Sequence, residues 1–257
     1  MKRLIEAEFQ RIWINKKTRI LLMLIILDTI LSCIFRLKSP SGSYDAKNYT
    51  VALNSLNFSP FIYQEVSLVL LYIVLPIIFI DSMNYEQIVG AFRMYMIRPY
   101  KKYEFMISKW ISLVLTTFIL IFIVFIISTI FGYLFMPKVS TVTFYNIQHK
   151  FNASSALLYI IKFYMIQFLV LLSILSIASI ISVTISNSVI SILSVIGSIV
   201  ILTHFTNVFE FLWRNVKYGF YTLGHTVPAS EHIAVLSLIV CGLFMGIEIW
   251  IKKDYLY

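Results

Sequence analysis

Six long runs of apolar residues constrain the fold of this chain more than any other feature. They cover about residues 18–35, 61–80, 110–136, 156–185, 189–205 and 232–251. A helix needs roughly 20 apolar residues to cross the hydrocarbon core of a bilayer. The chain is also 60% hydrophobic and only 13% charged, whereas soluble domains carry more charge. The sequence therefore predicts an all-α integral membrane protein with six transmembrane helices, forming one domain over residues 1–257.

The breaks between the runs are unequal. Only Ser186, Asn187 and Ser188 separate the fourth run from the fifth, which predicts a tight helical hairpin. The loop over residues 36–60 is polar and predicted to be irregular, and the loop over 137–152 is short. The last span holds Gly242 and Gly246 in a G-x-x-x-G pattern that permits close helix packing.

Basic residues indicate the orientation of the chain. With the N-terminus inside, the inner segments hold thirteen lysines and arginines and the outer loops hold seven. Positive charge is enriched on the cytoplasmic side of membrane proteins. Both termini are therefore predicted to lie in the cytoplasm. The net charge of +9 is explained by this bias, so we expect no nucleic-acid partner.

Residues 1–17 form a separate predicted element. On a helix, one stripe carries Ile5, Phe9, Ile12 and Trp13, and polar residues occupy the opposite side. This pattern predicts an amphipathic helix lying in the membrane interface. The alternative is a charged tail with chance periodicity. No small-residue cleavage site follows the first apolar run, so a cleavable signal peptide is not expected.

The stretch over residues 204–231 is rich in aromatic residues interrupted by charges. Amphipathic aromatic side chains suit the membrane–water boundary. We expect one or two short helices that lie at, or re-enter, the outer interface. The alternative is an ordinary loop with an aromatic belt.

Motifs for catalysis and cofactor binding are missing from the sequence. There is no G-x-x-x-x-G-K-[ST] phosphate loop, no H-E-x-x-H and no G-x-S-x-G. The two cysteines, Cys33 and Cys241, lie far apart, and no zinc spacing occurs. The four histidines are expected to be interfacial polar residues rather than metal ligands. The chain is thus not expected to be an enzyme or to bind a metal or cofactor itself.

The inner connector between the second and third runs, residues 81–109, is the strongest functional signal. Apolar residues recur there at helical spacing, at Tyr85, Ile88, Val89, Phe92, Tyr95 and Met96. This predicts an amphipathic helix that lies on the membrane or in a partner's groove. Arg98-Pro99 ends it, because proline disfavours helix in the residue before it, and a new helix then leads into the third run. The alternative is a basic loop that only fixes topology.

This organisation resembles the ABC-2 family of ABC transporter permeases over nearly the whole chain. The resemblance rests on the N-terminal helix, the six spans, the outer aromatic stretch and the inner run. In that family the inner run carries a coupling helix that docks into the ATPase subunit. The resemblance therefore implies that the coupling residues here are Asp81, Glu86, Gly90, Arg93, Arg98, Pro99, Lys101, Lys102 and Lys109. It also implies two ATPase subunits that bind ATP and Mg²⁺, and a second copy of this chain or a homologous permease.

Ionisable residues within the spans are candidates for a translocation path. Asp28 lies in the middle of the first run, and Glu65 and Lys162 lie nearer the outer ends of the second and fourth. A charge in mid-membrane costs roughly 2.5–3.5 kcal/mol on insertion scales. Asp28 therefore faces a path or subunit interface, or hydrogen-bonds to a neighbouring helix; both readings stay open. Glu65 and Lys162 reach the interface more easily.

The sequence thus favours the permease subunit of an exporter in a bacterial cell membrane. The scarcity of interior charge suits a hydrophobic or amphipathic cargo, such as a lipid, an antibiotic or a peptide. Small permeases of this kind resemble exporters of antimicrobial and cytolytic peptides, including phenol-soluble modulins. The alternatives are a secondary transporter or channel without an ATPase, and an intramembrane enzyme. The former needs a charge relay or an internal repeat, and the latter needs a partner group for Asp28.

Overall fold

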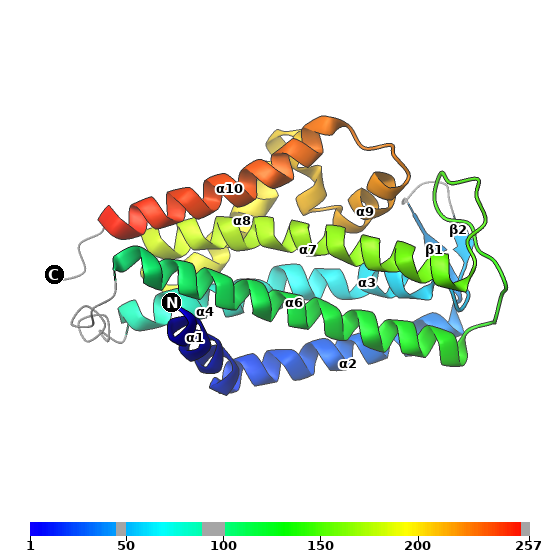
Figure 1. Cartoon of the computed structure of the whole chain (residues 1–257), viewed down its shortest axis with the longest axis horizontal. Coiled ribbons are helices and arrows are strands. Elements are labelled where there is room, and N and C mark those ends of the chain that lie inside the picture. Colours follow the sequence, from blue (N-terminus) through cyan, green and yellow to red (C-terminus); the bar gives the residue numbers. More distant parts are fainter. Residues whose placement is uncertain (45–49, 89–100, 253–257) are drawn as a thin grey trace.

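The chain folds into a bundle of long helices that run along a common axis (Figure 1). The structure, a computed structural model, describes residues 1–44, 50–88 and 101–252, and the side chains of these ranges other than 85–88. Within them, six helices are long and apolar enough to cross a membrane. Each predicted run lies inside one of these helices to within one residue. The prediction of an all-helical, multi-pass membrane architecture is confirmed at this level.

The elements follow the chain in simple order. They are α1 (Lys2–Ile14), α2 (Lys16–Lys38), β1 (Ser41–Ser43), β2 (Thr50–Ala52), α3 (Phe58–Val69), the π-helical segment η1 (Leu70–Val74), α4 (Leu75–Ile88), α6 (Lys102–Phe135), α7 (Ala153–Thr184), α8 (Ser188–Phe205), the 3₁₀ segment η2 (Asn207–Leu212), α9 (Asn215–Leu223) and α10 (Ala229–Lys252). The start of α1, the end of α4, the start of α6 and the end of α10 gather at one end of the bundle, here called the N-terminal end (Figure 1). The strands lie at the other end, here called the hairpin end.

The second span is one rod built from α3, η1 and α4, and its π-helical segment lies just before Pro76. Proline has no N–H to donate within a helix. In η1 the hydrogen-bond ladder widens, so that the N–H of Leu75 donates to the carbonyl of Leu70, five residues earlier. The wider turn accommodates the proline while the segment stays helical, as a backbone in lipid requires.

The predicted break between the fourth and fifth spans is also present. α7 ends at Thr184 and α8 begins at Ser188. The side chain of Asn187 accepts hydrogen bonds from the N–H groups of Val189 and Ile190, at 3.0 and 3.3 Å. This is the cap that an asparagine supplies to the exposed N–H groups at a helix start.

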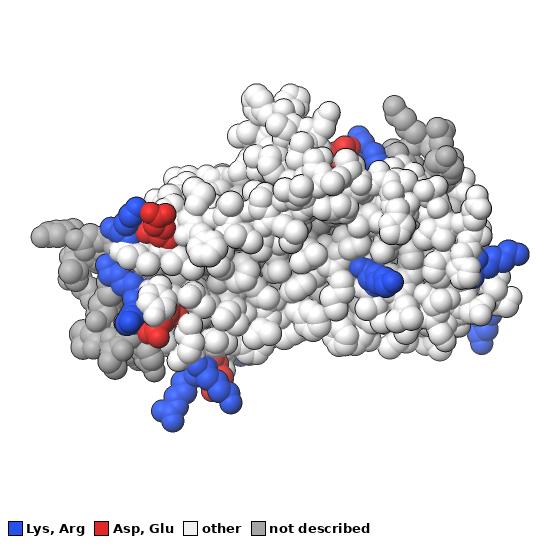
Figure 2. Space-filling view, turned by 45° about the horizontal axis from the view of Figure 1, so that its top comes forward, with Lys and Arg blue, Asp and Glu red and all other residues white. Residues whose placement is uncertain are grey.

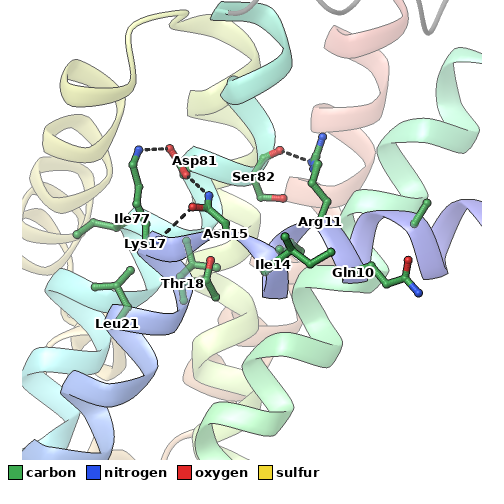
Figure 3. A pocket seen from close by; sticks show the side chains of 13 residues that line it. Gln10, Arg11, Ile14, Asn15, Lys17, Thr18, Leu21, Ile77, Asp81 and Ser82 are labelled. Atoms are coloured by element: carbon green, nitrogen blue, oxygen red, sulfur yellow. Dashed lines mark hydrogen bonds and ion pairs between the residues drawn. The ribbon is translucent and has the colours of Figure 1, made fainter.

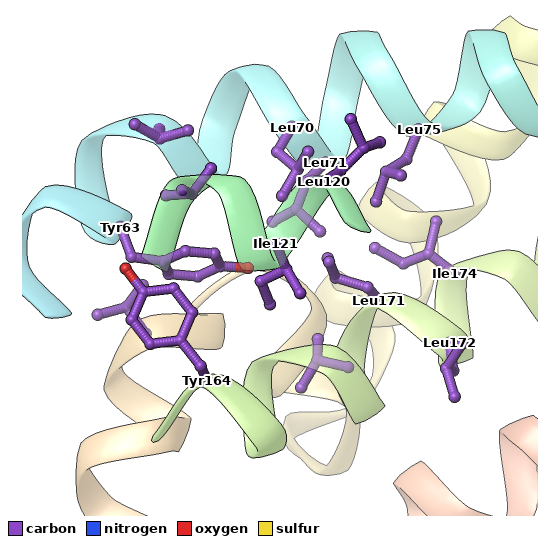
Figure 4. Close-up of a cluster of buried hydrophobic side chains, with 14 of the residues drawn as sticks. Tyr63, Leu70, Leu71, Leu75, Leu120, Ile121, Tyr164, Leu171, Leu172 and Ile174 are labelled. Atoms are coloured by element: carbon purple, nitrogen blue, oxygen red, sulfur yellow. The ribbon is translucent and has the colours of Figure 1, made fainter. Parts of the chain in front are cut away.

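α7 is the centre of the bundle, with 72% of its span buried, against 22% in α2 and 17% in α8. Leu171 and Ile174 of α7 pack with Leu70 of η1, Leu75 of α4 and Leu120 of α6 in a buried apolar cluster (Figure 4). α2 and α8 therefore keep wide apolar faces that are uncovered in the single chain.

α7 packs most extensively against α10, through small residues. Serine hydroxyls of α7 donate to carbonyls of α10: Ser176 to Ile239 at 3.3 Å and Ser179 to Gly242 at 3.5 Å. A β-carbon on Gly242 would lie only 2.4 Å from that of Ser176. The G-x-x-x-G pattern thus marks a close helix contact, with Gly242 at its tightest point.

The hairpin end differs from the irregular loop expected there. β1 and β2 form an antiparallel pair in which Gly42 opposes Val51. A β-carbon on Gly42 would lie 2.6 Å from the ring of Phe61, so a glycine lets the strand lie against the aromatic core. The aromatic stretch over 204–231 contains two short helical segments, η2 and α9.

Candidate functional site

Charged groups bring four helices together at the N-terminal end of the bundle. They are Glu8 and Arg11 of α1, Lys17 of α2, Asp81 of α4 and Lys109 of α6, with backbone and amide groups around them. We call this set the ionic junction. Figure 2 shows charged side chains at this end of the molecule, and a wide uncharged zone next to it.

Lys109 is the centre of the junction. Its side chain is 0% exposed, although it carries an ammonium group. Its Nζ lies 3.4 Å from Oε2 of Glu8 and donates to the carbonyl of Ser82 at 3.3 Å. A buried charge is tolerated only when it is paired and hydrogen-bonded. The carboxylate from α1 and the carbonyl from α4 supply those partners.

Glu8 is shared by two cations. Nη2 of Arg11 lies 2.6 Å from Oε2 of Glu8 and donates to the Ser82 carbonyl at 2.9 Å. The Ser82 carbonyl therefore accepts from both Arg11 and Lys109. This arrangement joins α1, α4 and α6 through one carboxylate and one carbonyl.

Asp81 makes the second set of contacts, one residue before Ser82. Its Oδ1 lies 2.9 Å from Nζ of Lys17, and its Oδ2 accepts from the amide of Asn15 at 3.0 Å. Asn15 also caps α2, accepting from the N–H of Lys17 at 3.1 Å. The turn between α1 and α2 is thus held against α4.

The sequence of α1 explains why it lies across this end. Leu4, Glu8 and Ile12 are its buried residues, and they are spaced four apart on one helical face. That face packs on α6, where the hydroxyl of Ser112 donates to the carbonyl of Ile5 at 3.1 Å. Trp13 and Phe9, from the predicted apolar stripe, are half-buried beside it. The interfacial position of α1 stays a prediction.

A cavity of about 520 Å³ lies beside the junction, between α1, α2 and α4 (Figure 3). We call it the junction pocket. Lys17, Asn15, Arg11 and Asp81 contribute polar groups to it. Its apolar wall is formed by Ile12, Ile14, Leu21, Ile77 and Ile78.

The predicted coupling residues fall into three groups. The side chain of Glu86, together with Gly90, Arg93, Arg98 and Pro99, lies outside the described residues. Asp81 and Lys109 lie in the ionic junction, and the buried side chain of Lys109 is not on the surface of the chain. Lys101 is exposed, and its N–H donates to Glu104 at 2.8 Å where α6 begins. The carbonyl of Lys102 accepts from the indole of Trp250 in α10 at 3.1 Å.

The predicted path residues do not form one cluster. Glu65 of α3 pairs with Arg36 of α2. Asp28 is half-buried on α2, and its Oδ2 has no hydrogen-bond partner among the described residues. Lys162 is exposed on α7. Asp28 and Glu65 therefore lie on the facing helices α2 and α3, and Lys162 lies apart.

The outer aromatic stretch carries a polar pair. The hydroxyl of Tyr218 in α9 lies 2.7 Å from Nδ1 of His232 in α10. Burial raises the pKa of Tyr218 to about 12, so the phenol keeps its proton to a higher pH than an exposed tyrosine does. Among the described residues no group of three or more His, Cys, Asp or Glu is placed to hold a metal ion. Cys33 and Cys241 are free thiols.

Sequence reasoning missed Glu8 and Arg11. The available signal was a glutamate at the centre of an apolar i, i+4 series, Leu4–Glu8–Ile12. A carboxylate in that position must find a buried cation. Lys109, eight residues into its helix, was the matching candidate.

The comparisons with known proteins identify no family for this chain. No protein-family model matches it, and no curated protein matches it.

Proposed function

We propose that this chain is the membrane-spanning subunit of an ATP-driven exporter of the ABC-2 permease type. Two copies, or one copy and a homologous permease, assemble with two ABC ATPase subunits that bind ATP and Mg²⁺. The complex moves a hydrophobic or amphipathic substrate out across a bacterial cell membrane. The chain itself supplies the path and no catalytic group.

The observation that supports this most is the position of the ionic junction relative to the inner connector. Asp81 and Ser82 stand at the start of residues 81–109, and Lys109 stands at the end. Both ends are tied to the same short element, α1 and its turn into α2. A displacement of the connector by a partner is therefore transmitted to α2, α4 and α6 together. Packed helices respond to such a displacement as rigid bodies.

The orientation follows from charge. Basic residues cluster around α1, at Lys2, Arg3, Arg11, Lys16, Lys17 and Arg19, and continue at Lys101 and Lys102. The positive-inside rule places this end in the cytoplasm. In that orientation α1 lies along the inner interface, the connector faces the ATPase, and η2 and α9 lie at the outer interface.

The exposed faces of α2 and α8 support a second permease subunit. Ile20, Met23 and Leu27 of α2 are more than half exposed, and half-buried Asp28 follows them on the same helix. A carboxylate that faced lipid at mid-span would be costly. A second subunit packed on α2 would cover this apolar face and complete the surroundings of Asp28, whose Oδ2 is already buried within the single chain, so the proposed path runs between the two subunits.

Asp28 is also the observation that favours the second candidate, a secondary transporter without an ATPase. Its Oδ2 has no hydrogen-bond partner among the described residues, and the neighbouring helix α3 carries a second carboxylate, Glu65. A proton-coupled carrier uses such carboxylates to bind and release the ion. Transport driven by a proton gradient in vesicles that hold only this chain would support this candidate and overturn the first.

The test of the coupling role uses the connector. Glu86→Trp and Gly90→Trp are expected to leave the chain inserted in the membrane. Each should reduce recovery of the ATPase subunit with the purified chain and abolish ATP hydrolysis that depends on the chain. Ser140→Trp, an exposed position at the hairpin end, is the matched control and should leave both unchanged. Normal hydrolysis in both connector variants would remove these residues from the contact.

A further inference from the structure

The junction pocket has two chemically different levels. Lys17 of α2 and Asp81 of α4 face each other at one level, joined by their 2.9 Å contact. Leu21 lies four residues further along α2, and Ile77 lies four residues before Asp81 on α4. Four helical residues correspond to about 6 Å. On both helices the pocket therefore changes from polar to apolar over one turn, towards the middle of the spans (Figure 3).

The pocket has a mouth and enough room for a ligand. Ala7, Gln10, Ile14 and Lys17 line it and are exposed, whereas Leu21 and Ile78 are buried. Its volume of about 520 Å³ falls within the roughly 300–1,000 Å³ of small-molecule sites. A group of a few heavy atoms at the polar level, with a chain on the apolar wall, fits these dimensions.

The charge around the pocket is positive. Its charged lining residues are Arg11, Lys17 and Asp81, which leaves one positive charge. Lys16 and Arg19, which are the sequence neighbours of the lining residues Lys17 and Thr18, are exposed and add positive charge to this end of α2. Basic pockets between spans on the cytoplasmic side attract anionic lipid headgroups.

Lys17 can donate a hydrogen bond to a ligand while its ion pair with Asp81 stays intact. Its side chain is 65% exposed, and an ammonium group has three N–H donors. One donor is used by Asp81, so the others can point to an anion in the pocket. The start of α2 lies at the same place, since Asn15, Lys17 and Thr18 all line the cavity. Helix starts favour negative charge.

We propose that the junction pocket binds an anionic phospholipid. The phosphate lies at the polar level beside Lys17, and an acyl chain runs along Leu21, Ile77 and Ile14. The amphipathic lining favours this ligand over a free anion, because a free anion has no apolar part to pack against the apolar wall. The bound lipid fills the space between α1, α2 and α4 and stabilises the contact of α1 with the bundle. This inference does not rest on an ATPase partner or on export.

The test is lipid binding to the purified full chain in neutral detergent after lipid removal. Native mass spectrometry follows titration with dioleoylphosphatidylglycerol, and separately with dioleoylphosphatidylcholine and glycerol 3-phosphate. We expect the phosphatidylglycerol to bind several-fold more tightly than phosphatidylcholine, and glycerol 3-phosphate not to be retained. Retention of glycerol 3-phosphate alone would assign the site to free anions and overturn the proposal.

Variants separate headgroup binding from the internal ion pair. Lys17→Gln should weaken phosphatidylglycerol binding about fivefold, the usual effect of one basic residue at a lipid surface. Lys17→Arg should retain it. In the double variant Lys17→Gln/Asp81→Asn the pair is replaced by neutral groups, and binding should stay weak. Recovery in the double variant would show that Lys17 only neutralises Asp81.

Two further variants test the position. Ala7→Trp places a large ring at the mouth of the pocket and should lower lipid binding. Position 7 is exposed, so the ring does not enter the protein interior. Lys138→Gln removes the same charge as Lys17→Gln at the exposed hairpin end and should not change binding. The proposal would be overturned if Lys17→Gln and Lys138→Gln changed phosphatidylglycerol binding equally. It would also be overturned if Ala7→Trp left that binding unchanged.

Discussion

At the scale of single residues, Glu8 is the carboxylate of the ionic junction that two cations share. Its carboxylate pairs with buried Lys109 and half-buried Arg11 at the same time. Removing the cation and removing the carboxylate of the buried pair are therefore not equivalent. If Lys109 is removed, Glu8 keeps Arg11 at 2.6 Å, but if Glu8 is removed, a buried ammonium loses the carboxylate that lies 3.4 Å from it.

This asymmetry gives a prediction for stability. Glu8→Gln should destabilise the chain by about 3–5 kcal/mol, as does breaking other buried ion pairs from one side. Lys109→Met should cost less, because it leaves the Glu8–Arg11 pair intact. Apparent unfolding temperatures of the purified chain, taken at one heating rate, give the order.

The control for these variants lies on the same helix. Glu6 is exposed, and it lies 4.0 Å from Lys2 in a surface pair. Such pairs contribute roughly 0–1 kcal/mol, so Glu6→Gln should leave the unfolding temperature nearly unchanged. A Glu8→Gln variant as stable as Glu6→Gln would show that the junction does not hold α1.

At the scale of elements, the contact between α7 and α10 is set by Gly242. A β-carbon there would meet Ser176, including its backbone Cα at 3.1 Å. At Gly246 the nearest atoms are side-chain ends, Ser179 Oγ at 3.1 Å and Met106 Cε at 3.3 Å, which can move. At Gly197 of α8 no atom of the described residues lies within 4 Å of the added carbon.

Three alanine substitutions test this contact. Gly242→Ala should lower stability by about 1–3 kcal/mol, the usual cost of an overpacked contact. Gly246→Ala should have a smaller effect. Gly197→Ala should be neutral or stabilising, because alanine favours helix over glycine by about 1 kcal/mol. The same thermal measurement ranks them, and equal values for Gly242→Ala and Gly197→Ala would contradict the close contact.

The elements themselves could be predicted from the sequence, because lipid imposes a length on apolar runs. Even the short break at Asn187 was visible, since an asparagine caps the next helix. The contacts of Lys109 were not predicted, although the position of Glu8 between Leu4 and Ile12 was a signal for a buried ion pair. An apolar run does not show which helix face is buried, and the carboxylate that pairs with this lysine lies 101 residues away. The predicted coupling role of the connector also depends on a second protein, which one sequence does not contain.

At the scale of the whole molecule, the structure has a buried centre and two exposed flanks. α7 is the centre, and α2 and α8 have the least covered spans. Charged groups concentrate at the ends of the bundle (Figure 2). In the proposed assembly, α2, which holds Asp28, packs against the second subunit. The ionic junction links α2 to both ends of the connector. In that assembly, motion at the N-terminal end of the bundle would reach the path through α2.

The account predicts that the path depends on Asp28. Asp28→Asn should reduce substrate transport while expression and unfolding temperature stay normal, because the neutral amide cannot provide the charge. Thr29→Ser, at the next residue but buried and bonded to the Ile25 carbonyl at 2.7 Å, is the control. Wild-type transport by Asp28→Asn would leave this carboxyl a structural role only.

The central proposal is that a separate ATPase drives conformational change in this chain through its inner connector. The most direct measurement is purification of the full chain from its native membrane in mild detergent, with identification of the proteins that accompany it and assay of ATP hydrolysis. The account predicts an ATP-binding subunit with a phosphate-binding loop, present in equal number with the permease subunits, and hydrolysis that Gly90→Trp abolishes. Recovery of the chain without any ATPase, together with substrate transport by the chain alone in vesicles, would contradict it.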